Sequence, residues 1–177
     1  MKLRIGPIVS SVVISAVLLF GGWFIYRQWA IERPLENIVK TYDGVNGVQL
    51  DIKPNELAVK LDLAPGTDLG NLVKKIEQDG KWQIGSRTLK LDVKDHSSPV
   101  LDELWQKALF SVAQAMETKK YTEITSALEQ MEQANAKVTA RAEMDEDNVY
   151  ITLTDGQASK FIILPRTPER LGAWPNA

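Results

Sequence analysis

Two kinds of apolar pattern divide this chain of 177 residues. From Ile5 to Tyr26 no side chain is charged, whereas beyond Arg27 apolar and polar residues alternate over short periods. At about 1.5 Å of rise per residue, a helix over the first stretch is long enough to cross the roughly 30 Å hydrocarbon core of a bilayer. The pattern therefore predicts an N-terminal transmembrane helix over residues 5–26, followed by a folded part.

The alternative interpretation of residues 5–26 is a cleaved signal peptide, which has a shorter apolar run and small residues at its cleavage site. Here the run ends in the bulky residues Trp23, Phe24, Ile25 and Tyr26. Aromatic side chains at such a place are typical of a membrane interface. We therefore expect an uncleaved single-pass anchor in a plasma membrane, with the lipid bilayer as a partner.

The orientation of the anchor is not decided by the Lys/Arg count, because Lys2 and Arg4 precede it and Arg27, Arg33 and Lys40 follow it. The start MKLR is similar to the basic beginning of a bacterial signal sequence. The chain also has no cysteine, which suits an oxidising compartment. These two features favour an extracytoplasmic C-terminal part.

The first half of the folded part predicts an α-β-β-α-β unit. Pro34 suits the first turn of a short helix. Apolar and polar side chains then alternate over 48–52 and 57–63 on either side of the turn KPNE, which predicts a β-hairpin. A helix capped by Thr67 or Asp68 and stopped by Gly80 follows, and a strand covers 89–93.

The second half predicts two helices and three strands. Ser98 and Pro99 suit the start of the longest helix, and a second amphipathic helix follows a break near ETKKYT. Three apolar-patterned segments, 137–144, 148–153 and 159–165, then predict an antiparallel meander. The fold class is thus α+β: a transmembrane helix, an α-β-β-α-β unit, and an α-α-β-β-β unit with an antiparallel sheet.

These patterns divide the chain into six segments. They are an N-terminal head 1–4, the transmembrane anchor 5–26, a juxtamembrane connector 27–33, the α-β-β-α-β unit 34–95, a helical segment plus three-stranded meander 96–165, and a flexible tail 166–177.

Composition excludes several kinds of site in the folded part. Without Lys2 and Arg4, the chain has 19 basic residues against 23 acidic ones, so it lacks the basic footprint of a nucleic-acid-binding protein. No cysteine and one histidine cannot supply the usual ligands of zinc. APGTDLG lacks the Lys-Ser/Thr ending of a phosphate-binding loop. We therefore expect no cofactor, no metal and no nucleic acid.

The acidic stretch MDEDNVYITLTDG, residues 144–156, is the part that looks most chemical. A calcium loop counted from Asp145 has an oxygen donor at its third position, Asp147, but Val149 at the fifth, Tyr150 at the sixth and Gly156 at the twelfth. The ligand register therefore fails after two positions. A strand bracketed by two turns accounts for the same residues without a metal.

A catalytic site has little support in this sequence. His96 stands between an aspartate and a serine, but sequence neighbours rarely converge into a triad, and no G-x-S-x-G elbow is present. A hydrolase would have to use clustered carboxylates, namely Glu143, Asp145 and Asp147. We expect a non-enzymatic protein with no catalytic residue.

Three features are candidates for binding. Ser11, Ser15 and Gly22 fall near one face of the predicted membrane helix, where small residues permit close helix contact and self-association. Phe110 lies off the main apolar stripe of the longest helix, so that helix is either covered by two layers or part of an interface. Trp174, in the tail, is a candidate partner contact or an exposed aromatic residue.

The segments LENIVKTYDGVNGVQLDIKPNELAVKLDL, TDLGNLVKKIEQDG and TLKLDVKD, within residues 34–95, resemble the ring-building motif of bacterial secretion and sporulation single-pass membrane proteins. The resemblance lies in the element order α-β-β-α-β after a membrane helix. It implies assembly of protomers side by side through small α+β modules.

The sequence leads to two hypotheses. The first is a membrane-anchored, non-enzymatic interaction or assembly protein of a bacterial cell envelope, with a protein partner or self-association. The alternative is a cytoplasmic-facing membrane adaptor that tethers a partner machine or protease.

Overall fold

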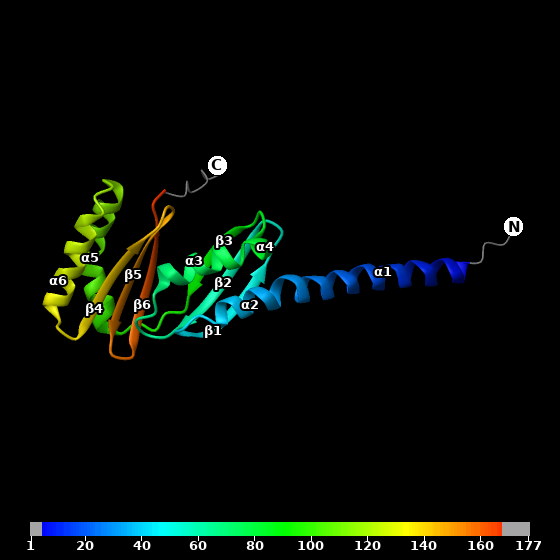
Figure 1. Cartoon of the computed structure of the whole chain (residues 1–177), viewed down its shortest axis with the longest axis horizontal. Helices are drawn as coiled ribbons and strands as arrows, with labels where there is room; N and C mark the ends of the chain where they lie inside the picture. Colours follow the sequence, from blue (N-terminus) through cyan, green and yellow to red (C-terminus); the bar gives the residue numbers. More distant parts are fainter. Residues whose placement is uncertain (1–4, 168–177) are drawn as a thin grey trace, which may run out of the picture.

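The computed structural model describes residues 5–167, with side chains described from residue 9 onward except at positions 27 and 28. Its elements run from a long N-terminal rod through two small α+β units (Figure 1). The bounds are α1 Ile5–Arg27, η1 Gln28–Glu32, α2 Arg33–Lys40, β1 Val45–Ile52, β2 Glu56–Leu63, α3 Leu69–Asp79, α4 Lys81–Ile84, β3 Thr88–Val93, α5 Pro99–Glu117, α6 Thr122–Ala134, β4 Val138–Met144, β5 Asn148–Asp155 and β6 Ala158–Pro165.

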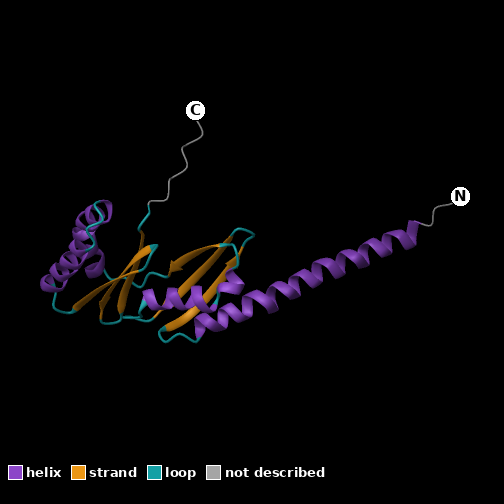
Figure 2. Ribbon diagram, turned by 45° about the horizontal axis from the view of Figure 1, so that its top comes forward, coloured by secondary structure: helices purple, strands orange, loops and turns teal. Residues whose placement is uncertain are grey.

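The rod is one continuous helical segment, because α1, the π-helical turn η1 and α2 follow one another without a gap. Figures 1 and 2 show α1 projecting far beyond the rest of the chain, whereas α2 lies against the first unit. Pro34 explains the local widening: it has no N–H to donate, and its ring crowds the carbonyl of Ala30 one turn earlier. Residues 27–33, expected as a connector, are therefore helical.

Within the described residues, this rod contains one helix that is long and apolar enough to cross a membrane. Its large apolar side chains from Val9 to Tyr26 are exposed, and none of the other described elements covers them. The exposure of so many apolar side chains is what a bilayer would relieve.

The first unit is a three-stranded sheet covered on one face by helices. β1 pairs antiparallel with β2, and β3 pairs parallel with β2, which lies in the centre. Alternation over 57–63 sends every second side chain of β2 inward, where α2 and α3 pack on it. The core of this unit is formed by Leu35, Val39, Leu57, Val59, Leu61, Leu63, Leu69, Leu72, Val73 and Ile76.

The second unit has its own antiparallel sheet, in the order β4-β5-β6. Ser98 caps α5 by accepting a hydrogen bond from the Leu101 N–H (3.3 Å), as its sequence position predicted. Helices α5 and α6 pack together on one face of this sheet. The expectation of an α+β fold with two such units is therefore confirmed, and the units do not share a sheet.

The two units are joined through the other face of β5 and β6. Tyr150, Phe161 and Ile163 point away from α5 and α6 and belong to the core of the first unit. The N–H of Ser159 donates to the carbonyl of His96 (3.0 Å). This bond attaches the segment between β3 and α5 to strand β6. Sheet β4-β5-β6 is thus the central layer of the folded part, with helices of the second unit on one side and the first unit on the other.

Candidate interaction site

Helix α5 leaves one of its faces uncovered. On its covered face, α5 buries Leu101, Leu104 and Ala108 in the core of the second unit. Leu109 is 41% exposed and Phe110 is 80% exposed, although both are large and apolar. Of the two alternatives left open by the sequence, burial between two layers does not hold for Phe110, and an exposed apolar face is present instead.

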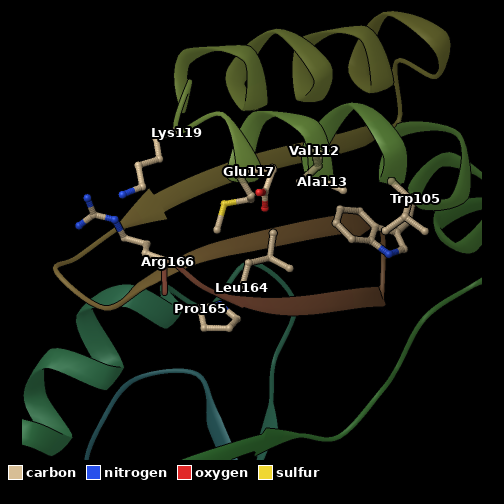
Figure 3. Close-up of a pocket in the computed structure, with 10 residues that line it drawn as sticks. Trp105, Val112, Ala113, Glu117, Lys119, Leu164, Pro165 and Arg166 are labelled. Atoms are coloured by element: carbon tan, nitrogen blue, oxygen red, sulfur yellow. The ribbon is translucent and has the colours of Figure 1, made fainter. Parts of the chain in front are cut away.

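An apolar groove lies beside this face, between α5 and the end of β6 (Figure 3). Its volume is about 400 Å³. The α5 wall carries Trp105, Leu109 and Met116, and the β6 wall carries Leu164 and Pro165. Such a groove is large enough to take one or two bulky apolar side chains of another molecule.

One end of the groove is basic. Lys119 and Arg166 lie there, opposite the end occupied by Trp105 (Figure 3), and Glu117 lines the groove from the helix side. Arg166 is held in place because its Nη1 donates to the carbonyls of Asp145 (2.7 Å) and Glu146 (3.0 Å). The sequence pattern assigned Arg166 to a flexible tail, but its side chain is part of the fold.

The guanidinium of Arg166 also stacks on Tyr121, with 5.1 Å from its Cζ to the ring centroid. Its Nε donates to the Tyr121 hydroxyl (3.3 Å). Arg166, directly after β6, is therefore held by Tyr121 at the start of α6 and by the β4–β5 turn.

The acidic stretch forms the wall of a second cleft, of about 650 Å³, between α3 and the β4–β5 turn. The structure brings Glu143, Asp145 and Asp147 to this cleft, together with Glu77. Burial, followed by the negative charges of Asp145 and Asp147, raises the pKa of Glu77. Burial and the hydrogen bond to Asp68 raise the pKa of Glu143.

Two of the carboxylates of this cleft, Asp145 and Glu143, are engaged in holding the fold. Asp145 Oδ1 accepts the N–H groups of Asp147 (2.8 Å) and Asn148 (2.7 Å), and its Oδ2 accepts the Tyr150 hydroxyl (2.5 Å). Glu143 Oε2 accepts the N–H of Gly70 (2.9 Å). The antiparallel β4–β5 pairing confirms the hairpin turn expected from Glu146-Asp147-Asn148, although Asn148 is already the first residue of β5. Over residues 5–167, no group of three potential ligands is placed to hold a metal ion.

The three residues around the histidine diverge. His96 Nε2 lies 2.9 Å from Asp62 Oδ1 on the first sheet, and Ser97 Oγ donates to Asp102 Oδ1 at the start of α5 (2.7 Å). Asp95 accepts the N–H of Ser97 (2.8 Å). This geometry links the two units and forms no nucleophile-base pair.

The structure of the single chain does not test whether the small residues of α1 mediate self-association. Ser11, Ser15 and Gly22 are exposed on the helix, and a Cβ built on Gly22 would meet no atom within 4 Å beyond its own helix backbone in the described part of the chain. Trp174 lies outside the described residues. Both features stay predictions.

The groove was only half visible in the sequence. Leu109 was recognisable because it lies off the helix stripe, but Leu164 and Pro165, in the opposite wall, come much later in the chain. Residues so far apart are brought together only by the assembled sheet, so no local pattern announces their contact. The run FIIL of β6 was the available signal, since consecutive apolar residues indicate a strand covered on both faces.

Comparison with known proteins gives no family: no family model, no curated protein and no solved structure matches the chain.

Proposed function

We propose that this chain is a membrane-anchored, non-enzymatic interaction protein of a bacterial cell envelope. The long apolar helix α1 is the anchor, and the groove between α5 and β6 is the binding surface. The observation that carries the proposal is this groove, which is lined by Leu109 with 41% of that residue exposed, while the next residue of α5, Phe110, is 80% exposed. Helix α5 lies at the end of the folded part opposite α1 (Figure 1). Exposed apolar patches of this kind mark interaction sites in proteins.

The chemistry of the groove specifies its occupant. Leu109, Met116 and Leu164 offer an apolar floor, and Lys119 and Arg166 offer positive charge at one end. The best fit is a protein segment that places one or two large apolar side chains over the floor and a carboxylate at the basic end. A second copy of this chain and a different protein are the two sources of such a segment.

The proposal is tested by the mass of the full-length chain extracted from membranes in a mild detergent. Wild type is expected in a complex larger than one chain. Leu109→Asp places an uncompensated charge in the groove and should release the complex. Lys60→Asp is the matched control, because Lys60 is exposed on the first sheet, away from the groove. A single-chain mass for wild type, or equal masses for both variants, contradicts the proposal.

The cytoplasmic-facing adaptor is separated from the envelope protein by a labelling experiment. Because the chain has no cysteine, Gln133→Cys gives a single thiol, on the exposed side of α6. A membrane-impermeant maleimide should label it on intact spheroplasts if the folded part is extracytoplasmic. Labelling only after permeabilisation would place the folded part in the cytoplasm and would leave the groove as its binding surface.

A further inference from the structure

The short helix α4 carries an exposed tryptophan on the first unit. Trp82 is 67% exposed, whereas Ile84, two residues later, packs against the core. No periodic pattern predicted this helix, because KWQI is a single turn closed by Gly85, whose φ of 61° suits glycine. The ring of Trp82 is therefore available to contact another molecule or a lipid surface.

The position of α4 identifies that partner. It contacts η1, the π-helical turn that directly follows α1. Figure 1 shows α4 at the end of the folded part from which α1 extends. Trp82 thus lies beside the rod, immediately beyond the end of its apolar stretch.

The height of Trp82 along the rod follows from simple geometry. A helix of five residues, such as η1, rises by about 7 Å. The polar zone on each side of a bilayer is about 5–7 Å thick, from the difference between the full thickness and the hydrocarbon core. If α1 spans the bilayer, η1 crosses this zone, and α4 packs against η1 at the same level.

A second exposed tryptophan marks the same level on the rod. Trp29, in η1, is 63% exposed, and the guanidinium of Arg33 lies 4.5 Å from its ring centroid. Ile31, also in η1, is instead buried in the core of the first unit. Tryptophan prefers the membrane-water interface, where its apolar ring and its N–H are both satisfied.

Arg87 holds helix α4, which carries Trp82, in place. Its Nε donates to the carbonyl of Lys53 in the β1–β2 turn (3.0 Å), and its Nη1 donates to the carbonyls of Gln83 and Ile84 (both 3.2 Å). These bonds tie α4 to the neighbouring turn. Lys81, beside Trp82, is exposed and adds a positive charge suited to phospholipid phosphates.

We propose that α4 is a second membrane contact, in which Trp82 inserts into the headgroup zone of the bilayer that α1 spans. This inference rests on the proposed membrane anchor. It goes further because two contacts, α1 and Trp82, fix the tilt of the folded part over the membrane. The groove at the far end is then held away from the lipid surface.

The test places full-length chain with a single tryptophan in phospholipid vesicles whose acyl chains carry bromine, a short-range quencher of tryptophan emission. Three variants keep Trp23, Trp82 or Trp105, and the other tryptophans are replaced by phenylalanine. Trp23 reports on the anchor, and Trp105, in the distal groove, is the control. We expect Trp23 and Trp82 to lose emission, with Trp82 quenched more by bromine near the headgroups than by bromine near the methyl ends.

The outcomes separate the two proposals. Quenching of Trp23 without quenching of Trp82 overturns the α4 contact and leaves the anchor intact. Absence of quenching at Trp23 overturns the anchor itself, and with it the α4 contact. Quenching of Trp105 to the same extent as Trp82 means that the whole folded part lies on the lipid, which also overturns the inference.

A second measurement does not depend on multiple substitutions. Trp82→Cys, in the chain that otherwise has no cysteine, carries one nitroxide label. In the headgroup zone this label should collide more with oxygen and less with a water-soluble nickel chelate than a label at Lys60→Cys. Equal collision rates at the two positions would overturn the inference.

Discussion

The two α+β units are built from similar elements but differ in the polarity of their exposed surfaces. The outer face of the first sheet is charged, and its side chains neutralise one another: Lys94 Nζ lies 2.9 Å from Asp62, and Lys90 Nζ lies 3.0 Å from Glu56. The second unit leaves Phe110 and an apolar groove on its surface. The first sheet therefore presents a charged surface whose charges are paired, whereas the second unit presents an exposed apolar surface suited to binding.

The difference also follows from the number of faces on which each sheet is covered. The first sheet is covered on one face, so its alternating pattern is complete: apolar inside and polar outside. The second sheet is covered on both faces, so apolar side chains of β5 and β6 pack into the core on each side of it. The exposed apolar side chains of α5 are then in excess of what the core requires, and that excess is the reason for assigning them to a partner.

The largest expected effect comes from breaking the joint between the units. Tyr150 is 2% exposed, fills the first core from the second sheet, and donates to Asp145. Tyr150→Ala should lower the free energy of unfolding by about 3–5 kcal/mol. Phe110→Ala, the matched control on an exposed aromatic residue, should change it by less than about 0.5 kcal/mol. Urea unfolding of both variants checks this contrast, and equal losses would contradict it.

An intermediate effect is expected at the contact between α3 and β4. A Cβ at Gly70 would lie 2.5 Å from Glu143 Oε2, so Gly70→Ala displaces the carboxylate that accepts the Gly70 N–H. We expect a loss of about 1–3 kcal/mol in the wild-type background. In the Glu143→Ala background only the 3.3 Å contact with the Cβ of residue 143 remains, which a small shift relieves, and alanine should stabilise the helix by about 0.5 kcal/mol. Thermal unfolding of the four chains tests this reversal; the same sign in both backgrounds would contradict it.

The smallest effect is a pH dependence at the same contact. Burial and the hydrogen bond with Asp68 raise the pKa of Glu143 above its ordinary value of 4.5, so the folded chain holds this proton more tightly than the unfolded chain. The stabilisation is present below pH 4.5 and is lost as pH rises through the folded value. Glu143→Gln keeps an acceptor for Gly70 but does not ionise.

Wild type should therefore lose stability relative to Glu143→Gln as the pH rises from about 4 to 7. Asp145 acts in the opposite direction, because its hydrogen bonds outweigh its burial and lower its pKa, but it is common to both chains. Melting temperatures measured across this range give the difference directly. A constant difference between the two chains would show that Glu143 does not titrate in this way.

The sequence predicted those parts of the fold that local patterns determine. Alternation over 57–63 predicted β2, and Asp68 caps α3 by accepting the Asn71 N–H (2.8 Å). The failed calcium register at Asp145 correctly predicted a turn. These features depend on residues a few positions apart, where backbone geometry and side-chain period act directly.

The parts that depend on distant residues were not predicted. Thr152 is polar and Tyr150 is amphipathic, so the local pattern gives no reason to bury their side chains, yet tertiary packing buries both. The opposition of α5 and Pro165 across the groove arises only when the sheet is assembled. Trp82 lies on a single turn too short to show a period, and its place beside η1 depends on the packing of Ile31 and Ile84 into one core.

The central claim is that the groove between α5 and β6, and not the charged sheet of the first unit, contacts a partner. The most direct measurement is site-specific photo-crosslinking in the cells that produce the full-length chain, with p-benzoylphenylalanine at Phe110 or at Lys60, two exposed positions. The account predicts a defined protein adduct at Phe110, absent in the Leu109→Asp background, and no adduct at Lys60. An adduct of equal yield at Lys60, or none at Phe110, would contradict it.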